Sequence, residues 1–290
     1  MSWRTVVVTK RAKLELKLNS LVVRGEETKQ IFLGEINTII VENTAVSLTA
    51  ALLCEISKRK IKIIFCDEKR NPQSELISYY GSHDNSSKIE KQLAWSSQTI
   101  GQVAQSILQE KINNQAAVLG KLSLLGKESL LRLAQELKIN DPHNHEAHAA
   151  KIYFNNLFGM DFTRQQDNMI NAALNYGYAI LLSAFNRTIV ANGYLTQLGI
   201  YHHSGFNHFN LSSDLMEPWR PLVDIFVFSN QWTKFENEEK MMLVNLLNSE
   251  VVIANKKQTV INALEIYCQS IFNALEKDDM SLIKFFKNAI

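Results

Sequence analysis

The first 70 residues show the hydrophobic pattern of a small β-rich domain. Leu14, Leu16 and Leu18 alternate with polar neighbours, and this period of two is typical of a half-buried strand. Residues 44–60 change to a helical spacing of apolar positions and end on three basic residues, which favour a helix C-terminus. Other short runs rich in Val, Ile and Thr predict further strands at residues 3–9, 21–23, 30–33, 38–42 and 61–66.

The pattern changes after residues 67–87, a stretch that contains Asn71-Pro72, Gly81-Ser82 and other turn-forming residues. From residue 88 onward, apolar positions recur at helical spacing. The helix expected at 167–192 is mostly apolar, so we expect it to be central to the core. The spacing predicts helices at residues 88–110, 112–122, 127–138, 142–158, 167–192, 213–228, 237–249, 257–275 and 281–288.

Together these patterns predict an α+β chain in three parts. A small N-terminal β-rich domain at residues 1–75 is followed by a linker at 76–87 and by a larger all-α C-terminal domain at 88–290. Residues 1–75 carry four more Lys and Arg than Asp and Glu, and the remainder carries two fewer, a difference that chance alone can produce. If the second part handles phosphates near its acidic groups, it needs divalent cations.

Composition narrows the class of protein. A chain of 290 residues with 46% hydrophobic and 21% charged residues is ordinary for a soluble protein of one or two domains. Cys54, Cys66 and Cys268 are far apart and form no CxxC pair, which argues against a disulfide framework or a zinc ribbon and fits a reducing cytoplasm. Because there is no apolar leader and no apolar run of 18 residues, we predict neither secretion nor a membrane span.

Residues 199–224 hold the first group of chemically active side chains. Asp214 and Glu217 are three apart, so a helix through them points both carboxylates to one side. His202 and His203 lie upstream across a polar, turn-like segment. Imidazoles that face carboxylates can bind a metal or perform general acid–base chemistry. Histidines that only cap or border an acidic helix start are an equally open interpretation.

A second group lies on a helix that we expect to begin after Asp141-Pro142, a helix-entry signal. Glu146 and Tyr153 share one face of this helix, where small alanines let a ligand or another backbone come close. His145 and His148 are three residues apart. The zinc-protease motif needs histidines four apart, so that motif is excluded.

Three blocks of the helical part occur in an order and spacing that resemble a known family. They are HEAHAAKIYF at 145–154, FTRQQDNMINAALNYGYAILLSAFNR at 162–187 and LGIYHHSGFNHFNLSSDLMEPWRP at 198–221. With the β-rich part before them, they resemble the CRISPR-associated integrase, the DNA endonuclease-integrase of spacer acquisition. The residues of these blocks are most similar to those of the type II branch, which is found with the single-protein RNA-guided effector nuclease. The resemblance covers essentially the whole chain.

The resemblance implies a catalytic metal site and assigns its ligands. Glu146 is the first residue of a Glu-x-x-Ala-Ala pattern, and His202 is the last residue of a Leu-Gly-x-x-His pattern. Glu217 is the last residue of an Asp-Leu-x-Glu pattern that precedes an Arg-Pro. His203 directly follows His202, so the sequence leaves the register open by one residue. Pro218 disfavours a helical conformation at Glu217, which predicts a kink or a place in the first turn of a helix. Two carboxylates and one imidazole suit Mg²⁺ or Mn²⁺ and suit structural zinc poorly.

Four other side chains are candidates for supporting roles. Arg164 and Arg220 are candidates for DNA binding through phosphate, and Arg220, three residues after Glu217, is also placed to orient that carboxylate. Structural ion pairs are the competing interpretation for both arginines. His203 and Asp214 are expected to support the metal ligands from a second layer.

The same resemblance implies the reaction and the partners. In this family a DNA 3′-hydroxyl attacks a phosphodiester in the CRISPR repeat, so we expect an integrase that inserts prespacers in CRISPR adaptive immunity. The implied partners are double-stranded DNA, a second copy of the chain, a small ferredoxin-like adaptation protein that bridges two dimers, other type II adaptation proteins and the effector nuclease. A metal-dependent nuclease for branched DNA and a DNA-binding scaffold with an inactive metal site are the alternatives.

Overall fold

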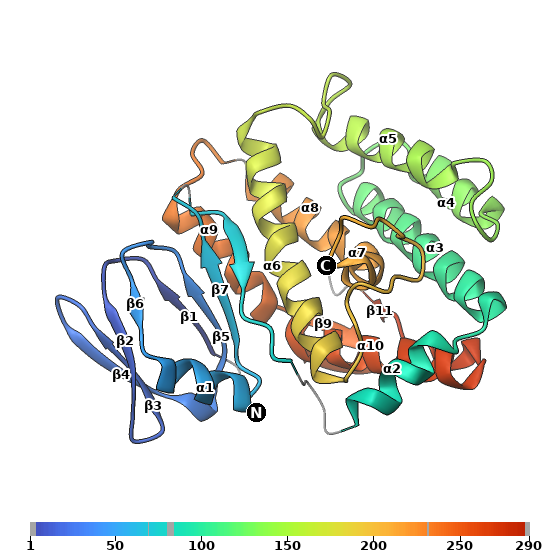
Figure 1. Ribbon diagram of the computed structural model, residues 1–290. Coiled ribbons are helices and arrows are strands. Elements are labelled where there is room, and N and C mark those ends of the chain that lie inside the picture. Colours follow the sequence, from blue (N-terminus) through green and yellow to red (C-terminus); the bar gives the residue numbers. More distant parts are fainter. Residues whose placement is uncertain (1–3, 69, 80–83, 231, 288–290) are drawn as a thin grey trace. The chain divides into compact units, whose positions relative to one another are not determined.

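The computed structural model describes residues 4–68, 70–79, 84–230 and 232–287, and the chain forms two compact units, residues 1–83 and 84–290 (Figure 1). The first unit is β-rich and the second is mostly helical, which confirms the predicted α+β class. The last strand of the first unit ends at Glu75, and the first helix of the second begins at Asn85. No helix among the described residues is long and apolar enough to cross a membrane.

Two four-stranded sheets build the first unit. The sheet with the order β1-β5-β7-β8 has three parallel strands and an antiparallel edge, and its strands are Arg4–Val8, Ile36–Val41, Lys62–Cys66 and Pro72–Glu75. The sheet with the order β4-β3-β2-β6 consists of Thr28–Phe32, Ser20–Arg24, Lys13–Lys17 and Ser47–Leu48. One hydrophobic core includes residues of both sheets and of helix α1 (Ala50–Lys58). Trp3, in the strand predicted at 3–9, lies outside the described residues.

The strand expected to continue to Leu18 ends one residue earlier. β2 and β3 are joined by a two-residue turn at Leu18 and Asn19, whose φ angles of 48° and 60° are those of a type I′ turn. Leu14 is fully buried as the alternation predicted, but Leu18 is 83% exposed because it belongs to the turn. The helix predicted at 44–60 is also shorter, since Thr49 caps α1 by accepting a hydrogen bond from the Leu52 backbone N–H.

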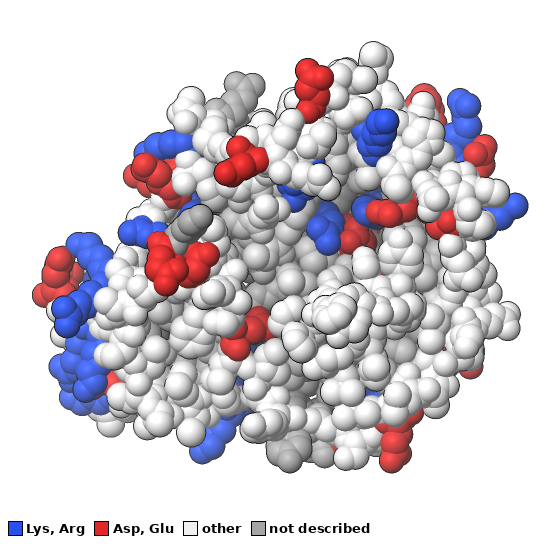
Figure 2. All heavy atoms as spheres, turned by 45° about the horizontal axis from the view of Figure 1, so that its top comes forward, with Lys and Arg blue, Asp and Glu red and all other residues white. Residues whose placement is uncertain are grey.

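The positive charge of the first unit is not a bare basic patch. Figure 2 shows Lys and Arg side chains mixed with Asp and Glu on the face that it draws. Lys10 pairs with Glu26 at 2.8 Å, and Arg24 pairs with Glu15 at 2.5 Å. Several Lys and Arg side chains of the first unit are therefore paired with carboxylates of the same unit.

The second unit contains nine α-helices within the described residues. They are α2 (Asn85–Leu93), α3 (Ser97–Lys121), α4 (Lys127–Glu136), α5 (His145–Phe158), α6 (Met169–Ala191), α7 (Asn210–Met216), α8 (Arg220–Asn230), α9 (Asn237–Asn245) and α10 (Val260–Lys277). A three-stranded antiparallel sheet, ordered β10-β9-β11, is formed by Lys256–Thr259, Glu250–Ile253 and Phe286–Lys287. The helical spacing did not predict this sheet.

Several predicted helix boundaries are wrong for identifiable reasons. The break expected near residue 111 lies at residues 94–96 instead, where the Ser96 hydroxyl caps α3 by accepting from the Thr99 backbone N–H at 3.1 Å. The helix predicted at 281–288 is wrong for the described residues: Met280–Leu282 form a single 3-10 turn, residues 286–287 pair with β9, and Asn288 lies outside the described residues. The hairpin of β9 and β10 turns at Ala254 and Asn255, both with positive φ.

Helix α6 is central to the second unit, as its apolar pattern predicted. It packs against α7, α8, α9 and α10, and Figure 1 shows it in yellow beside α7 and α8. Its buried residues include Tyr176, Tyr178 and Phe185. At Gly177 the helix comes so close to α8 that an added Cβ would lie 2.5 Å from Val223 Cγ1.

We expect Gly177→Ala to lower the free energy of unfolding by about 1–3 kcal/mol, the usual cost of overpacking a core. The matched control is Gly120→Ala in α3, whose added Cβ would meet only the flexible Lys127 side chain, with Cδ at 2.9 Å. That control should be neutral or more stable, because alanine favours a helix over glycine by about 1 kcal/mol. Urea unfolding of both variants tests the contact, and an unchanged Gly177→Ala protein would contradict it.

Candidate active site

Glu146 lies in the first turn of α5, which begins three residues later than predicted. The Asp141 carboxylate accepts hydrogen bonds from the backbone N–H groups of His145 at 2.8 Å and Glu146 at 2.9 Å. These two donors would otherwise lack partners at the start of the helix. Asp141 therefore caps the start of α5 and fixes the position of Glu146 in its first turn.

Glu217 lies where the chain passes from α7 to α8. Glu217, Pro218 and Trp219 form a single 3-10 turn between the two helices, so the interruption expected at Pro218 is present. Glu217 itself nevertheless keeps helical angles, with φ −52° and ψ −47°. The Asn114 side-chain amide of α3 donates to the Pro218 carbonyl at 2.9 Å, which ties this turn to α3. Glu217 is 5% exposed.

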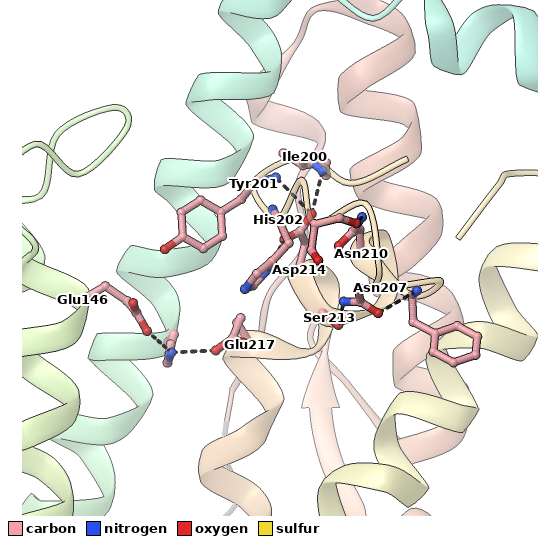
Figure 3. Close-up of polar contacts among 12 residues, drawn as sticks. Glu146, Ile200, Tyr201, His202, Asn207, Asn210, Ser213, Asp214 and Glu217 are labelled. Atoms are coloured by element: carbon pink, nitrogen blue, oxygen red, sulfur yellow. Dashed lines mark hydrogen bonds and ion pairs between the residues drawn. The ribbon is translucent and has the colours of Figure 1, made fainter. Parts of the chain in front are cut away.

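The ammonium group of Lys111, from the middle of α3, lies between these two carboxylates. Its Nζ is 2.6 Å from Glu217 Oε2 and forms a second ion pair with Glu146 Oε1. Figure 3 shows Glu146 and Glu217 pointing toward one another across these two contacts. Burial acts against the ammonium form, but Glu217 and Glu146 outweigh it and raise the pKa of Lys111 above its usual value. Lys111 is therefore a buried cation shared by two acidic side chains.

Arg220 engages the other oxygen of Glu217. Its Nε donates to Glu217 Oε1 at 3.0 Å, and its guanidinium lies 4.7 Å from the centre of the Tyr178 ring. Burial alone would raise the pKa of Glu217, but the charges of Lys111 and Arg220 hold it below its usual value. This contact places Arg220 where it orients the Glu217 carboxylate. The expected role of Arg220 in DNA binding stays a prediction.

Arg164 is fixed by helix α6. Its guanidinium donates to the side-chain oxygens of Asn171 and of Asn175, the latter at 2.6 Å. It also lies over the Tyr178 ring at 5.2 Å from the ring centre. Arg164 and Arg220 thus meet at one aromatic ring. A contact between Arg164 and DNA also stays a prediction.

His202 lies in the loop that connects α6 to α7, and Asp214 organises that loop. The Asp214 carboxylate accepts from the backbone N–H groups of Ile200 at 2.6 Å, Tyr201 at 3.0 Å and His202 at 2.9 Å. It also contacts His202 Nδ1 at 2.6 Å, and this hydrogen bond raises the pKa of His202. With Nδ1 held in this way, Nε2 is the nitrogen that His202 presents to a ligand.

The sequence left open whether His202 or His203 is the ligand. His203 is exposed, which favours its neighbour His202. The contact with Asp214 is made by His202, and the charge of Glu217 also acts on His202 and favours its protonated form. In Figure 3 the ring of Tyr201, one residue before, points toward Glu146. The structure thus brings His202, Glu146 and Glu217 to one region, and it places His203 in solvent.

Two carboxylates and one imidazole are the donors that this region offers to a metal ion. Among the described ranges, no group of three His, Cys, Asp or Glu side chains is positioned to hold a metal as it stands. Two carboxylates nevertheless face one cation, and a carboxylate and imidazole donor set suits a hard divalent ion. The donors therefore fit Mg²⁺ or Mn²⁺ in kind, and a lysine ammonium holds the position between the carboxylates.

Comparison with known proteins identifies the family. The family model for CRISPR associated protein Cas1 matches residues 5–254, so the chain belongs to this family. A CRISPR-associated endonuclease Cas1 from Neisseria meningitidis serogroup C (strain 8013) is 38% identical over 229 residues, which are 78% of this chain and 75% of the relative.

Two solved structures share the fold. A casposase bound to integration product has a TM-score of 0.79 and 18% identity, with coverage of 97% of this chain and 92% of that chain. A chain of a Cas6-RT-Cas1–Cas2 complex has a TM-score of 0.74 and 19% identity, and the match covers 97% of this chain and 36% of that one. The family model and the 38% identical relative confirm the resemblance inferred from the three sequence blocks.

Sequence reasoning missed Lys111 because no local signal distinguishes it. It lies among the helical residues 97–121, where a lysine is usually on a solvated face. Its separation from Glu146 is 35 residues, so only the packing of α3 against α5 shows the contact. The one hint is chemical: the buried Glu217 and the partly buried Glu146 need a cation to balance them.

Gly199 leaves room for the turn that carries His202. An added Cβ would lie 2.2 Å from the His202 carbonyl oxygen and 2.8 Å from Asp214 Oδ2. We expect Gly199→Ala to displace Asp214 and to return the pKa of His202 toward its usual value, measured by NMR titration of the ring. Gly205→Ala is the matched control in the same loop, because its Cβ would meet nothing within 4 Å. Equal His202 titration in both variants would contradict this account.

Asp224 gives the fold a pH dependence near the site. It is 1% exposed and accepts a hydrogen bond from the Tyr178 hydroxyl, and burial raises its pKa to about 6. A raised pKa means that its stabilising contribution is complete below the unfolded value of about 3.9 and is lost as pH rises through about 6.

Asp224→Asn should remove that loss, since the amide never ionises. The free energy of unfolding of the variant, relative to the wild type, should rise by about 2 kcal/mol between pH 4 and pH 7. Urea unfolding at four pH values and constant ionic strength measures this difference. Curves that stay parallel over the range would show that Asp224 does not titrate there.

Proposed function

We propose that this chain is a divalent-metal-dependent DNA integrase that inserts prespacers into a CRISPR array. The carrying observation is that Glu146 and Glu217, from separate elements, face one shared buried cation beside His202. Membership of the Cas1 family supports the CRISPR role. The relative named as an endonuclease and the casposase bound to integration product support DNA strand chemistry.

In this proposal, Glu146, His202 and Glu217 hold Mg²⁺ or Mn²⁺. When bound, such an ion polarises a phosphodiester and lowers the pKa of an attacking hydroxyl. The chain's other residues prepare this site. Asp214 holds His202 through Nδ1 so that Nε2 faces outward, and Arg220 fixes one oxygen of Glu217.

The reaction that we propose is an exchange of phosphodiester bonds. The 3′-hydroxyl oxygen of the incoming DNA bonds to a repeat phosphorus, while the bond from that phosphorus to the 3′-oxygen of the repeat strand breaks. The incoming hydroxyl loses a proton, and the departing oxygen gains one. One phosphodiester forms for each one broken, so the step needs no nucleotide cofactor or protein nucleophile.

The proposed partners follow from the same role. Double-stranded DNA supplies both prespacer and repeat, and the β-rich part is proposed to join two copies of the chain. The solved Cas1–Cas2 complexes support a second adaptation protein, which we propose is small, ferredoxin-like and placed between two dimers. Other type II adaptation proteins and the RNA-guided effector nuclease complete the proposed set, in the cytoplasm.

A nuclease that acts on branched DNA without integration is the second candidate, favoured by the endonuclease name of the relative. Water in place of the DNA hydroxyl would turn the same exchange into hydrolysis. A DNA-binding scaffold with an inactive site is the third. Incubation with prespacer and a supercoiled repeat plasmid separates them: joined product supports the integrase, cut branched DNA alone the nuclease, and binding without chemistry the scaffold.

Substitution of the proposed ligands tests the site itself. Glu146→Ala, His202→Ala and Glu217→Ala should each lower joining by at least about 100-fold, more than the loss of a supporting partner around a metal costs. Their DNA binding should stay within a few-fold of the wild type, because phosphate affinity is spread over many cations.

His203→Ala is the matched control, since this neighbouring imidazole is exposed. It should join DNA as the wild type does. An active His202→Ala protein together with an inactive His203→Ala protein would move the ligand by one residue. Circular dichroism of all four variants checks that each is folded.

A further inference from the structure

Lys111 has more carboxylate partners than a simple structural ion pair requires. Its ammonium contacts two carboxylates from two different elements, at the start of α5 and in the turn between α7 and α8. The side chain leaves the middle of α3, and Lys111 is only 8% exposed. Both carboxylates are the residues to which the proposed function assigns a metal ion.

The charges of this cluster balance before any ion is added. Lys111 and Arg220 carry two positive charges, and Glu146 and Glu217 carry two negative ones. Buried carboxylates without a cation are costly, so the two lysine contacts satisfy a real electrostatic need. A divalent ion entering among them would bring two positive charges to a site that is already neutral.

A metal ion that binds Glu146 and Glu217 together would take the place between them that the Lys111 ammonium now holds. Both oxygens are engaged, Oε1 by Arg220 and Oε2 by Lys111. The planar Arg220 guanidinium is also held against the Tyr178 ring. Lys111 carries a compact ammonium on a flexible four-carbon stem, so it is the partner that moves more easily.

We propose that Lys111 is the resident counter-cation of this site and an internal competitor of the divalent metal. Its ammonium keeps Glu146 and Glu217 facing one another in the metal-free protein and must leave Glu217 Oε2 when the metal binds. It thereby sets how much metal the enzyme needs. This inference rests on the proposed function, because it takes both glutamates as metal ligands.

A purely structural role predicts something different. A lysine that only ties three elements together would leave a destabilised protein when removed, with metal affinity unchanged or weaker. A competitor would leave a protein that is destabilised without metal and that binds metal more tightly. The effect of metal on stability, measured without DNA, distinguishes the two.

The test is Lys111→Met, which keeps an unbranched side chain one atom shorter and removes the charge. The full-length variant and the wild type are titrated with Mn²⁺, and the thermal midpoint and the Mn²⁺ concentration at half-saturation are recorded. Without Mn²⁺, we expect the thermal midpoint of the variant to be lower than that of the wild type. With Mn²⁺, the midpoint of the variant should return toward the wild-type value. The Mn²⁺ concentration at half-saturation should fall by at least about tenfold, because the wild-type affinity is scaled down to the small fraction of molecules in which the ammonium has left the site.

Lys62→Met is the matched control in the β-rich unit. Lys62 is also buried, at 4% exposure, and forms an ion pair with Glu75. Its removal should lower the thermal midpoint as well. Mn²⁺ should not restore that midpoint, since the site of Lys111 is untouched. Recovery of both variants would show a general effect of Mn²⁺ and would overturn the inference.

A Lys111→Met protein with the same or a higher half-saturation concentration than the wild type would overturn the competitor role. A variant that stays unfolded with and without Mn²⁺ would also overturn it, because the metal then fails to replace the ammonium. In either case a wild type that binds Mn²⁺ and joins DNA leaves the proposed function standing. A wild type that binds no Mn²⁺ would remove both.

Discussion

The helical unit is organised around the need to balance carboxylates away from water. Glu217 is nearly inaccessible, yet nearby positive charges keep its pKa below the usual value, so it is ionised. A charge in that position is tolerated only with close counter-charges and hydrogen bonds. Lys111 and Arg220 supply them, and each is supported in turn by its own helix or by an aromatic ring. The arrangement of α3, α5 and the α7–α8 turn follows from this constraint.

A second carboxylate, Asp214, is stabilised in a different way. It has no lysine or arginine partner among its contacts in the described residues and is instead surrounded by donors: three backbone N–H groups and the His202 ring. Several hydrogen bonds to one ionised carboxylate stabilise its charge as a counter-ion would. Asp214 therefore shapes the loop and holds the imidazole, while Glu217 stays available to a cation. Two acidic residues three apart thus have separate tasks.

Much of this was predictable from sequence because the signals were local or repeated. The alternation around Leu14 and the apolar length of residues 167–192 indicated the sheet and the central helix, and three sequence blocks indicated the family. Positions that depend on turn geometry were missed, as at Leu18 and in the hairpin of β9 and β10, where the turn residues adopt positive φ. Lys111 was missed for another reason: its role is defined by partners far along the chain, and no short pattern encodes that.

The distance along the chain between the site residues also bears on when the protein becomes an enzyme. Lys111 and Glu146 are 35 residues apart, and the nearby tie from Asn114 to Pro218 spans 104 residues. Contacts of such separation form late in folding, because long loops must close before the contact rewards them. No newly synthesised fragment that ends before Glu217 can hold the two carboxylates together. A growing chain that has not yet reached Glu217 therefore lacks the pair of carboxylates on which the proposed chemistry depends.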